Sequence, residues 1–297
     1  MKETAIQNQI HLSDVKDLLP QIGDGVVDLA IIDPPYYKIS KEPWEDGWTC
    51  RDDGLKWTAK WVGEISRVLR LSGSLYLYGC SKNLLTLASV GEQLEKTGFE
   101  FRQEIIVNKG MKATAGRTSR SHKTFPMVSE NILLFVKDAK PFVRELLQSR
   151  KKFKGLSSKE INAMMGFQTN GGGNWTKYAG ETRFPPLPTK QHWDKLQNIL
   201  DFNLEYEKIA PTFNTRWGLT NVWDDINFGS EKRIHPTQKP CRLAERLIKV
   251  SSNEGNFVLD LFSGSGNVSK ISKKLKRHFI GIEACESYHG KSLENLN

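Results

Sequence analysis

Short apolar runs separated by helix-length segments constrain the fold of this chain more than any other feature. The run VVDLAIID (26–33) is almost continuously apolar, which is typical of a strand buried on both faces of a parallel sheet. The segment 55–70 carries apolar residues at helical spacing, at Leu55, Ala59, Val62, Ile65 and Leu69. Residues 72–79 then predict a second strand, and residues 83–98 a helix closed by Gly98. This alternation predicts an α/β fold with a doubly wound sheet.

The same texture continues on both sides of a long central region. Residues 99–110 and 129–138 predict two further strands, paired across the loop between them. Near the end of the chain, a strand (257–262), a glycine-bearing turn and a helix precede a last strand at 278–283. These segments extend the predicted sheet.

The central region, 145–220, has a different composition. It contains three consecutive glycines, several prolines and several aromatic residues, and it resembles neither a helix nor a strand for long. We therefore expect an insertion or a small subdomain between two α/β halves, 1–144 and 221–297.

Composition excludes several classes of protein. A chain of 297 residues with 38% hydrophobic and 26% charged residues is long enough to bury a full core without disulfides. The four cysteines show no CxxC spacing, so neither a metal site nor a disulfide framework is expected, and a reduced cytoplasm is the expected location. No signal peptide or membrane span is expected, because no apolar run of either kind occurs. The net charge of +9 favours a polyanionic partner without proving one.

The stretch FVLDLFSGSGN places an acid at the end of a strand, directly before small residues that lead into a helix. Such a turn exposes backbone N–H groups and lets a ligand approach closely. Glu283 closes the next strand, 23 positions after Asp260, where a carboxylate can accept both hydrogens of a ribose diol. The third glycine of the dinucleotide fingerprint is missing. A nucleotide-type ligand follows, and both a nicotinamide cofactor and S-adenosylmethionine fit these residues.

Three motifs in a fixed order carry a resemblance to a known family. Asp33-Pro34-Pro35-Tyr36 resembles the DPPY motif of the DNA amino-methyltransferases, and FSGSG (262–266) resembles their cofactor loop. HPTQKP (235–240) precedes that loop, as it does in the β class of the family. The resemblance implies a Rossmann-like, S-adenosylmethionine-dependent methyltransferase fold with a permuted motif order and an inserted recognition region. In that fold 1–144 is the catalytic half, 145–220 the target-recognition insertion and 221–297 the cofactor-binding half.

The resemblance implies methyl transfer to N6 of a flipped adenine in double-stranded DNA. The exocyclic amine is a poor nucleophile, because its lone pair is delocalised into the ring. In the family, the Asp33 side chain and the Pro34 carbonyl accept its two hydrogens, and Pro34 and Pro35 keep the turn stiff. Tyr36 offers a face on which the extruded base stacks. Asp33 is not expected to act as a conventional general base, because the charge that develops on nitrogen itself acidifies the amine.

Cofactor contacts also follow from the resemblance. The residues implied are Asp14, Asp33, His235, Thr237, Gln238, Lys239, Asp260, Phe262, Gly264, Ser265, Gly266 and Glu283. Four residues of the HPTQKP motif, His235, Thr237, Gln238 and Lys239, match positions that bind the carboxylate end of the cofactor. Glu283 matches the ribose position. Asp14 matches the segment that meets the cofactor adenine, although Ser13 stands where the family usually has glycine.

The loop 108–123 is basic and contains no acid. Its cations are Lys109, Lys112, Arg117, Arg120 and Lys123. Because the loop follows a strand of the catalytic half, we expect these side chains to contact DNA phosphates. Sequence selection would then fall to 145–220, whose Asn, Gln, Arg and Trp residues could read base edges or fill a gap in the duplex.

Alternative functions follow from the same residues. Methylation of cytosine at N4 uses the same geometry, although a serine in place of Asp33 is more usual there. A catalytically silent, DNA-binding relative is disfavoured by intact Asp33, Tyr36, Gly264 and Glu283. A nicotinamide dehydrogenase is disfavoured because DPPY has no role in hydride transfer. The resemblance leaves a cognate restriction endonuclease and a second copy of the chain open as partners.

Overall fold

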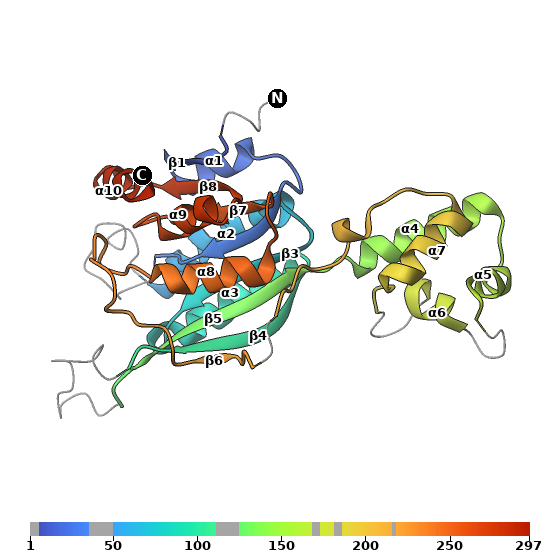
Figure 1. Ribbon diagram of the computed structural model, residues 1–297, viewed down its shortest axis with the longest axis horizontal. Coiled ribbons are helices and arrows are strands. Elements are labelled where there is room, and N and C mark those ends of the chain that lie inside the picture. Colours follow the sequence, from blue (N-terminus) through green and yellow to red (C-terminus); the bar gives the residue numbers. More distant parts are fainter. Residues whose placement is uncertain (1–5, 36–49, 111–124, 168–172, 181–185, 216–217) are drawn as a thin grey trace. The chain divides into compact units, whose positions relative to one another are not determined.

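The structure is a computed structural model that describes residues 6–35, 50–110, 125–167, 173–180, 186–215 and 218–297. It divides into two compact units, one formed by 1–137 with 212–297 and the other by 138–211 (Figure 1). Five residues singled out by the sequence lie outside the described residues, namely Tyr36, Lys112, Arg117, Arg120 and Lys123.

The described strands of the first unit form one sheet in the order β1-β8-β7-β2-β3-β5-β4-β6. Their bounds are β1 (Gln9–Leu12), β2 (Val27–Ile32), β3 (Leu69–Gly79), β4 (Phe99–Asn108), β5 (Ser129–Lys137), β6 (Val222–Trp223), β7 (Phe257–Asp260) and β8 (His278–Glu283). The predicted pairing of the two strands around the basic loop is confirmed, because β4 and β5 run antiparallel. The strand β3 starts earlier than predicted, directly where the preceding helix ends.

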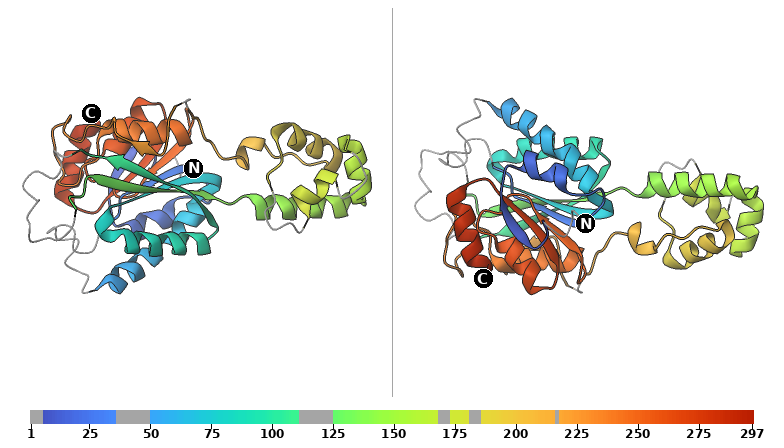
Figure 2. Two further views of the ribbon diagram at one scale, coloured as in Figure 1. Left: turned by 90° about the horizontal axis from the view of Figure 1, so that it is seen from below. Right: turned by 90° about the horizontal axis from the view of Figure 1, so that it is seen from above.

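Helices cover both faces of this sheet (Figure 2). Those of the first unit are α1 (Val15–Leu18), α2 (Arg51–Val68), α3 (Leu84–Lys96), α8 (Cys241–Ser251), α9 (Asn267–Lys274) and α10 (Glu286–Leu296). Side chains of α1, α2 and α3 form one hydrophobic cluster with the sheet, and side chains of α8 and α9 form a second one. A sheet buried on both faces explains why its strands read as continuous apolar runs. The α/β, Rossmann-like fold expected from the sequence is confirmed.

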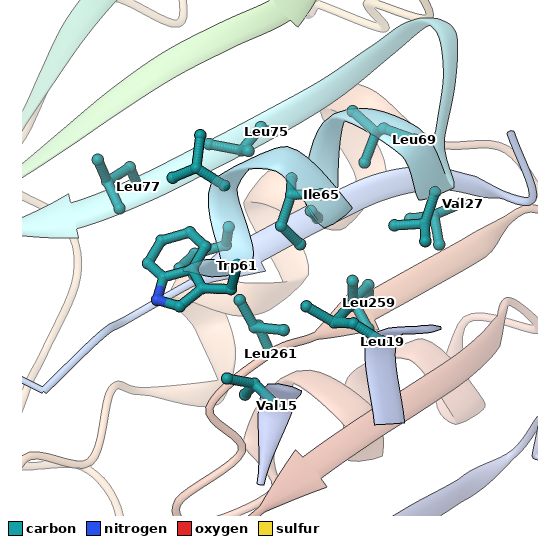
Figure 3. Packing of buried hydrophobic residues seen from close by; sticks show 14 of the residues in the cluster. Val15, Leu19, Val27, Trp61, Ile65, Leu69, Leu75, Leu77, Leu259 and Leu261 are labelled. Atoms are coloured by element: carbon teal, nitrogen blue, oxygen red, sulfur yellow. The ribbon is translucent and has the colours of Figure 1, made fainter. Parts of the chain in front are cut away.

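Trp61 lies at the centre of the first cluster (Figure 3). It is fully buried on α2, with Ile65 one turn further along the same helix face. Its ring meets Phe262 edge to face, with ring centres 5.9 Å apart, and Trp57 contacts the same phenylalanine at 5.6 Å. The core of this layer therefore also fixes a side chain of the predicted cofactor loop.

The second unit is helical, so the expectation that the central region forms neither helix nor strand for long was wrong. Its helices are α4 (Lys140–Lys154), α5 (Ser158–Met165), α6 (Gly173–Ala179) and α7 (Lys190–Leu200). Gly155 and Gly166 adopt left-handed conformations at the C-caps of α4 and α5 and so end these helices. Ser157 and Glu160 form a capping box at the start of α5.

Two tryptophans of this unit fill its core. Trp175 and Trp193 are 4% and 0% exposed, and the Trp193 indole donates to the Leu204 carbonyl at 2.7 Å. Neither is placed to read a base in the described structure, which corrects the expectation for these side chains. The unit spans 138–211, compared with the 145–220 expected. No helix in the described parts of the chain is long and apolar enough to cross a membrane.

Two glycine substitutions test the packing around β8. A Cβ atom at Gly281 would lie 2.8 Å from the hydroxyls of Ser263 and Ser269 and 2.9 Å from Ile10, all in packed structure. We expect Gly281→Ala to lower the free energy of unfolding by about 1–3 kcal/mol. At Gly290 in α10 a Cβ atom meets nothing within 4 Å, so Gly290→Ala should raise it by about 0.5–1 kcal/mol. Urea unfolding measures both, and a similar change for the two variants would contradict the packing described here.

Candidate active site

Five strand ends meet at one edge of the sheet. The strands β1, β8, β7, β2 and β3 are parallel, so their carboxyl ends lie side by side. The register pairs Ile31 of β2 with Asp260 of β7, and Leu12 of β1 with Glu283 of β8. Asp33 and the loop after β7 are therefore neighbours, although more than 200 residues separate them in the sequence. The carboxyl edge of a parallel sheet is where ligands of such folds bind.

A cavity of about 580 Å³ opens at this edge. The described residues that line it belong to the first unit and include Ser13, Asp14, Asp33, Pro34, Pro35, Trp57, Tyr78, His235, Thr237, Gln238, Lys239, Phe262, Ser263, Gly264, Ser265, Asn267, Ile282, Glu283 and Cys285. The structure thus brings the described part of the DPPY motif, the HPTQKP motif and the glycine loop around one space. Of the described residues expected in the site from these motifs, Asp260 and Gly266 do not line it.

Asp260 is buried beneath the cavity. Its carboxylate accepts hydrogen bonds from the backbone N–H and the hydroxyl of Ser269, at 3.2 and 2.8 Å. Ser269 lies in the first turn of α9, where N–H groups lack partners within the helix. Asp260 therefore holds the start of α9 against the end of β7. Burial raises the pKa of Asp260 to about 6, although the bonds from Ser269 and Ser263 oppose this, and nearby Glu283 raises it further.

The glycine loop needs glycine for its backbone shape. Gly264 and Gly266 have φ values of 50° and 73°, in the left-handed region that other residues rarely adopt. The Gly266 N–H bonds to the Ser263 carbonyl at 2.7 Å, which closes the turn before α9. Gly266 packs against Ile10 and Ser292 rather than lining the cavity.

Glu283 connects this loop to the end of β8. One carboxylate oxygen accepts from the Gly264 N–H at 2.8 Å, and the other accepts from the Cys285 N–H at the same distance. Burial raises the pKa of Glu283, although these two backbone N–H groups oppose the effect. The carboxylate is therefore fixed in orientation at the cavity wall.

His235 contacts the glycine loop. Its ring atoms lie 3.4 Å from the position of a Cβ atom at Gly264, and its ring meets Tyr288 with centres 4.3 Å apart. Burial lowers the pKa of His235 to about 4, with Lys239 and Lys291 adding to the effect and Asp33 opposing it. The imidazole is therefore neutral near pH 7.

Lys239 pairs with the acid of the DPPY motif. Its ammonium donates to the Asp33 carboxylate at 2.8 Å, where the side chains are 15% and 22% exposed. Burial acts to lower the pKa of Lys239, but the Asp33 and Glu130 carboxylates outweigh it and hold the pKa above its ordinary value. This pair joins the DPPY motif to the HPTQKP motif.

Sequence reasoning missed several residues of the cavity wall, among them Trp57, Tyr78 and Asn267. Trp57 was inside a predicted helix, and no motif marks it. Tyr78 stands near the carboxyl end of β3, and strand adjacency could have indicated it only if the strand order were known. Asn267 follows the glycine loop, where its amide bonds to the Lys239 carbonyl at 2.7 Å.

Lys109 is the one residue of the predicted DNA-contact set that falls within the described ranges. Its ammonium pairs with Glu130 at 2.8 Å, and the two side chains are 20% and 15% exposed. The acid on the neighbouring strand partly neutralises this cation. A phosphate contact by Lys109 stays a prediction.

The burial of Asp260 predicts how stability depends on pH. The folded state favours the protonated form, because its pKa of about 6 exceeds the ordinary 3.8. The stability that this group contributes is present below about pH 4 and is lost as the pH rises toward 6, by roughly 2–3 kcal/mol. An asparagine at position 260 has nearly the same shape as the aspartate but does not titrate. Urea unfolding at pH 4 to 7 should show that Asp260→Asn gains stability relative to the wild type as the pH rises. A difference that does not vary with pH would contradict the burial of this carboxylate.

Comparison with known proteins identifies the family. The N6/N4 DNA methylase family model matches residues 27–294. The Type II methyltransferase M1.MboII of Moraxella bovis is 29% identical over 297 residues, which is 98% of this chain and 96% of that protein. The DNA adenine methyltransferase YhdJ of Escherichia coli (strain K12) is 28% identical over 289 residues, 94% of this chain and 79% of that protein.

A solved structure shares the fold. The crystal structure of the M1.HpyAVI–SAM complex superposes with a TM-score of 0.59 at 19% identity, over 97% of this chain and 98% of that one. The family model spans both sequence-distant halves of the cavity wall. The chain belongs to the N6/N4 DNA methylase family.

Proposed function

We propose that this protein transfers a methyl group from S-adenosylmethionine to N6 of adenine in DNA. The observation that carries the proposal is the shared cavity: Asp33, Pro34 and Pro35 line the same space as Gly264 and Glu283. The proposed acceptor for the amine and the proposed site for a nucleotide-type ligand therefore lie in one continuous cavity. A methyl transferase needs this juxtaposition, because donor and acceptor must meet in line.

The residues of the cavity fit S-adenosylmethionine. Glu283 presents a fixed carboxylate to a ribose diol, and Phe262 presents an aromatic surface held by Trp57 and Trp61. At Gly264 the φ of 50° favours glycine, and a Cβ atom there would lie in van der Waals contact with the His235 ring at 3.4 Å. Asp14, Thr237 and Gln238 add polar groups around the wall. When bound, S-adenosylmethionine supplies an electrophilic methyl group on sulfur.

The chain itself prepares the amine. The Asp33 carboxylate and the Pro34 carbonyl act as a pair of acceptors for the two amine hydrogens, which favours a nitrogen whose lone pair is available for attack. Pro34 is buried, and two consecutive prolines restrict the backbone, so the acceptors need little reorganisation. Neutral His235 stands on the side of the glycine loop and adds no second cation beside Lys239.

Adenine is preferred over cytosine because residue 33 is an aspartate. The family includes N6 and N4 enzymes, so membership alone supports only methylation of an exocyclic amine. Both relatives are similar over almost the whole chain; M1.MboII is named a Type II methyltransferase and YhdJ a DNA adenine methyltransferase. These names favour a DNA substrate and are compatible with the assignment of adenine.

The helical unit, 138–211, is the proposed target-recognition region. Exposed basic side chains lie on three of its helices, at Arg144, Lys152, Lys159 and Lys177. Such cations suit contacts with the DNA backbone, whereas the buried tryptophans hold the unit together. A cognate restriction endonuclease, a homodimer and a cytoplasmic location stay predictions from the sequence.

Product analysis tests the proposal directly. The purified protein is incubated with S-adenosylmethionine and unmethylated genomic DNA, and the digested nucleosides are separated and identified by mass. We expect N6-methyladenine. N4-methylcytosine would overturn the choice of base but keep the family chemistry, and the absence of any methylated base on diverse DNA would contradict the proposal.

The substitution Asp33→Ala tests the acceptor pair. Because the lost carboxylate acts mainly on the reacting amine, we expect turnover to fall by about a hundredfold or more. Binding of S-adenosylmethionine, measured by calorimetry, should survive at least in part. A variant that keeps a tenth of wild-type turnover would remove Asp33 from its assigned role.

Glu283→Ala tests the ribose contact. Losing hydrogen bonds to a charged acceptor should weaken binding of S-adenosylmethionine by roughly 1–3 kcal/mol. Glu294→Ala, which removes an exposed acid from α10, is the matched control and should bind normally. Equal affinities for the two variants in calorimetry would show that Glu283 does not contact the cofactor.

A further inference from the structure

The ion pair between Asp33 and Lys239 joins two chain segments that are 206 positions apart. Asp33 follows β2 at the carboxyl edge of the sheet, and Lys239 lies two residues before α8. The ammonium lies 2.8 Å from a carboxylate oxygen, with both side chains largely shielded from water. At this distance and burial the attraction is much stronger than between exposed charges.

Lys239 is held at both ends. Its backbone carbonyl accepts from the Asn267 amide at 2.7 Å, and Asn267 in turn accepts from Asn295 at 2.8 Å. Its ammonium lies 5.3 Å from the centre of the Tyr78 ring, a distance at which a cation is attracted by an aromatic face. The position of the charge is therefore set by α9, α10 and β3 as well as by Asp33.

The resemblance to known methyltransferases implied that Lys239 binds the carboxylate end of the cofactor. The geometry favours another role, because the ammonium donates to the carboxylate that is proposed to receive the amine. A donor fixed on one carboxylate oxygen restricts rotation of the carboxylate and so sets the direction of its other lone pairs.

We propose that Lys239 is a positioning residue, whose ammonium holds the Asp33 carboxylate in a fixed orientation for the incoming amine. This inference rests on the function proposed above for Asp33. A carboxylate offers about four lone-pair sites, and the ammonium, as a point-like donor, takes one of them. Lys239 acts through Asp33 and does not touch the base.

A titration of Lys239 tests the pair without any catalysis. The full chain is labelled with ¹³C at the lysine Cε atoms, and the signal of Lys239 is assigned by its loss in Lys239→Met. In Asp33→Asn the burial of the ammonium is no longer offset by the Asp33 carboxylate, so the pKa of Lys239 should fall. An unchanged pKa would overturn the proposal.

Kinetics of the Lys239 variants test the consequence. For Lys239→Met we expect kcat to fall by about a hundredfold while the Kd for S-adenosylmethionine, from calorimetry, changes by less than about threefold. Lys239→Gln keeps a neutral donor, and we expect it to retain more activity than Lys239→Met.

Lys249→Met is the matched control. It removes a lysine from the exposed face of α8, where Lys249 pairs with Glu245, and should leave kcat unchanged. A weaker Kd with normal kcat in Lys239→Met and Lys239→Gln would make Lys239 a cofactor anchor and overturn the proposal. So would an unchanged kcat with an unchanged Kd. If the wild type methylates no DNA, the proposed function fails, and the titration of Lys239 still decides whether the pair exists.

Discussion

The parallel pairing of β2 with β7 is the constraint on which the site depends. It places the end of a strand from the first fifth of the chain beside the end of a strand from the last fifth. Backbone hydrogen bonds between adjacent strands fix this spacing to about 5 Å. A one-residue slip would turn Asp260 away from Ser269 and move the glycine loop relative to Asp33, so register and site geometry are the same property.

Three acids cluster at this edge, and each is satisfied in a different way. Asp260 is buried and accepts hydrogen bonds from Ser269, so its role is structural. Glu283 receives one backbone N–H on each oxygen, which fixes its orientation while leaving lone pairs. Asp33 contacts an ammonium. Like charges in a shielded site repel each other. Because each acid has its own hydrogen-bond or ion-pair partner, neighbouring carboxylates can have different roles.

The two units divide structure and chemistry between them. The whole cavity wall belongs to the sheet unit, whereas the helical unit has its own core around Trp175 and Trp193. A helical unit with an independent core can change its surface without disturbing the catalytic edge. This arrangement suits a protein in which one unit carries the proposed methyl transfer and the other unit is proposed to select the DNA target.

The sequence by itself determined the class of the fold and most of the motif residues at the cavity. Apolar runs of strand length and helical spacing in segments such as 55–70 depend on local geometry, so they could be recognised directly. DPPY, FSGSG and HPTQKP carry their own chemistry in short stretches, so residues such as Asp33 and Gly264 could be named in advance. The helices of the second unit were missed because the region contains three consecutive glycines and several prolines, which are typical of loops.

Only the tertiary structure decided which partner each motif residue meets. Asp260 and Gly266 belong to the cofactor motif in sequence, but packing against Ser269, Ile10 and Ser292 takes them out of the cavity wall. Lys239 belongs to a motif expected at the cofactor, but the neighbouring strand end brings Asp33 within 2.8 Å of its ammonium. A sequence motif specifies residue types and spacing along one segment. Contacts across more than 200 residues depend on strand order and register, which no single segment contains.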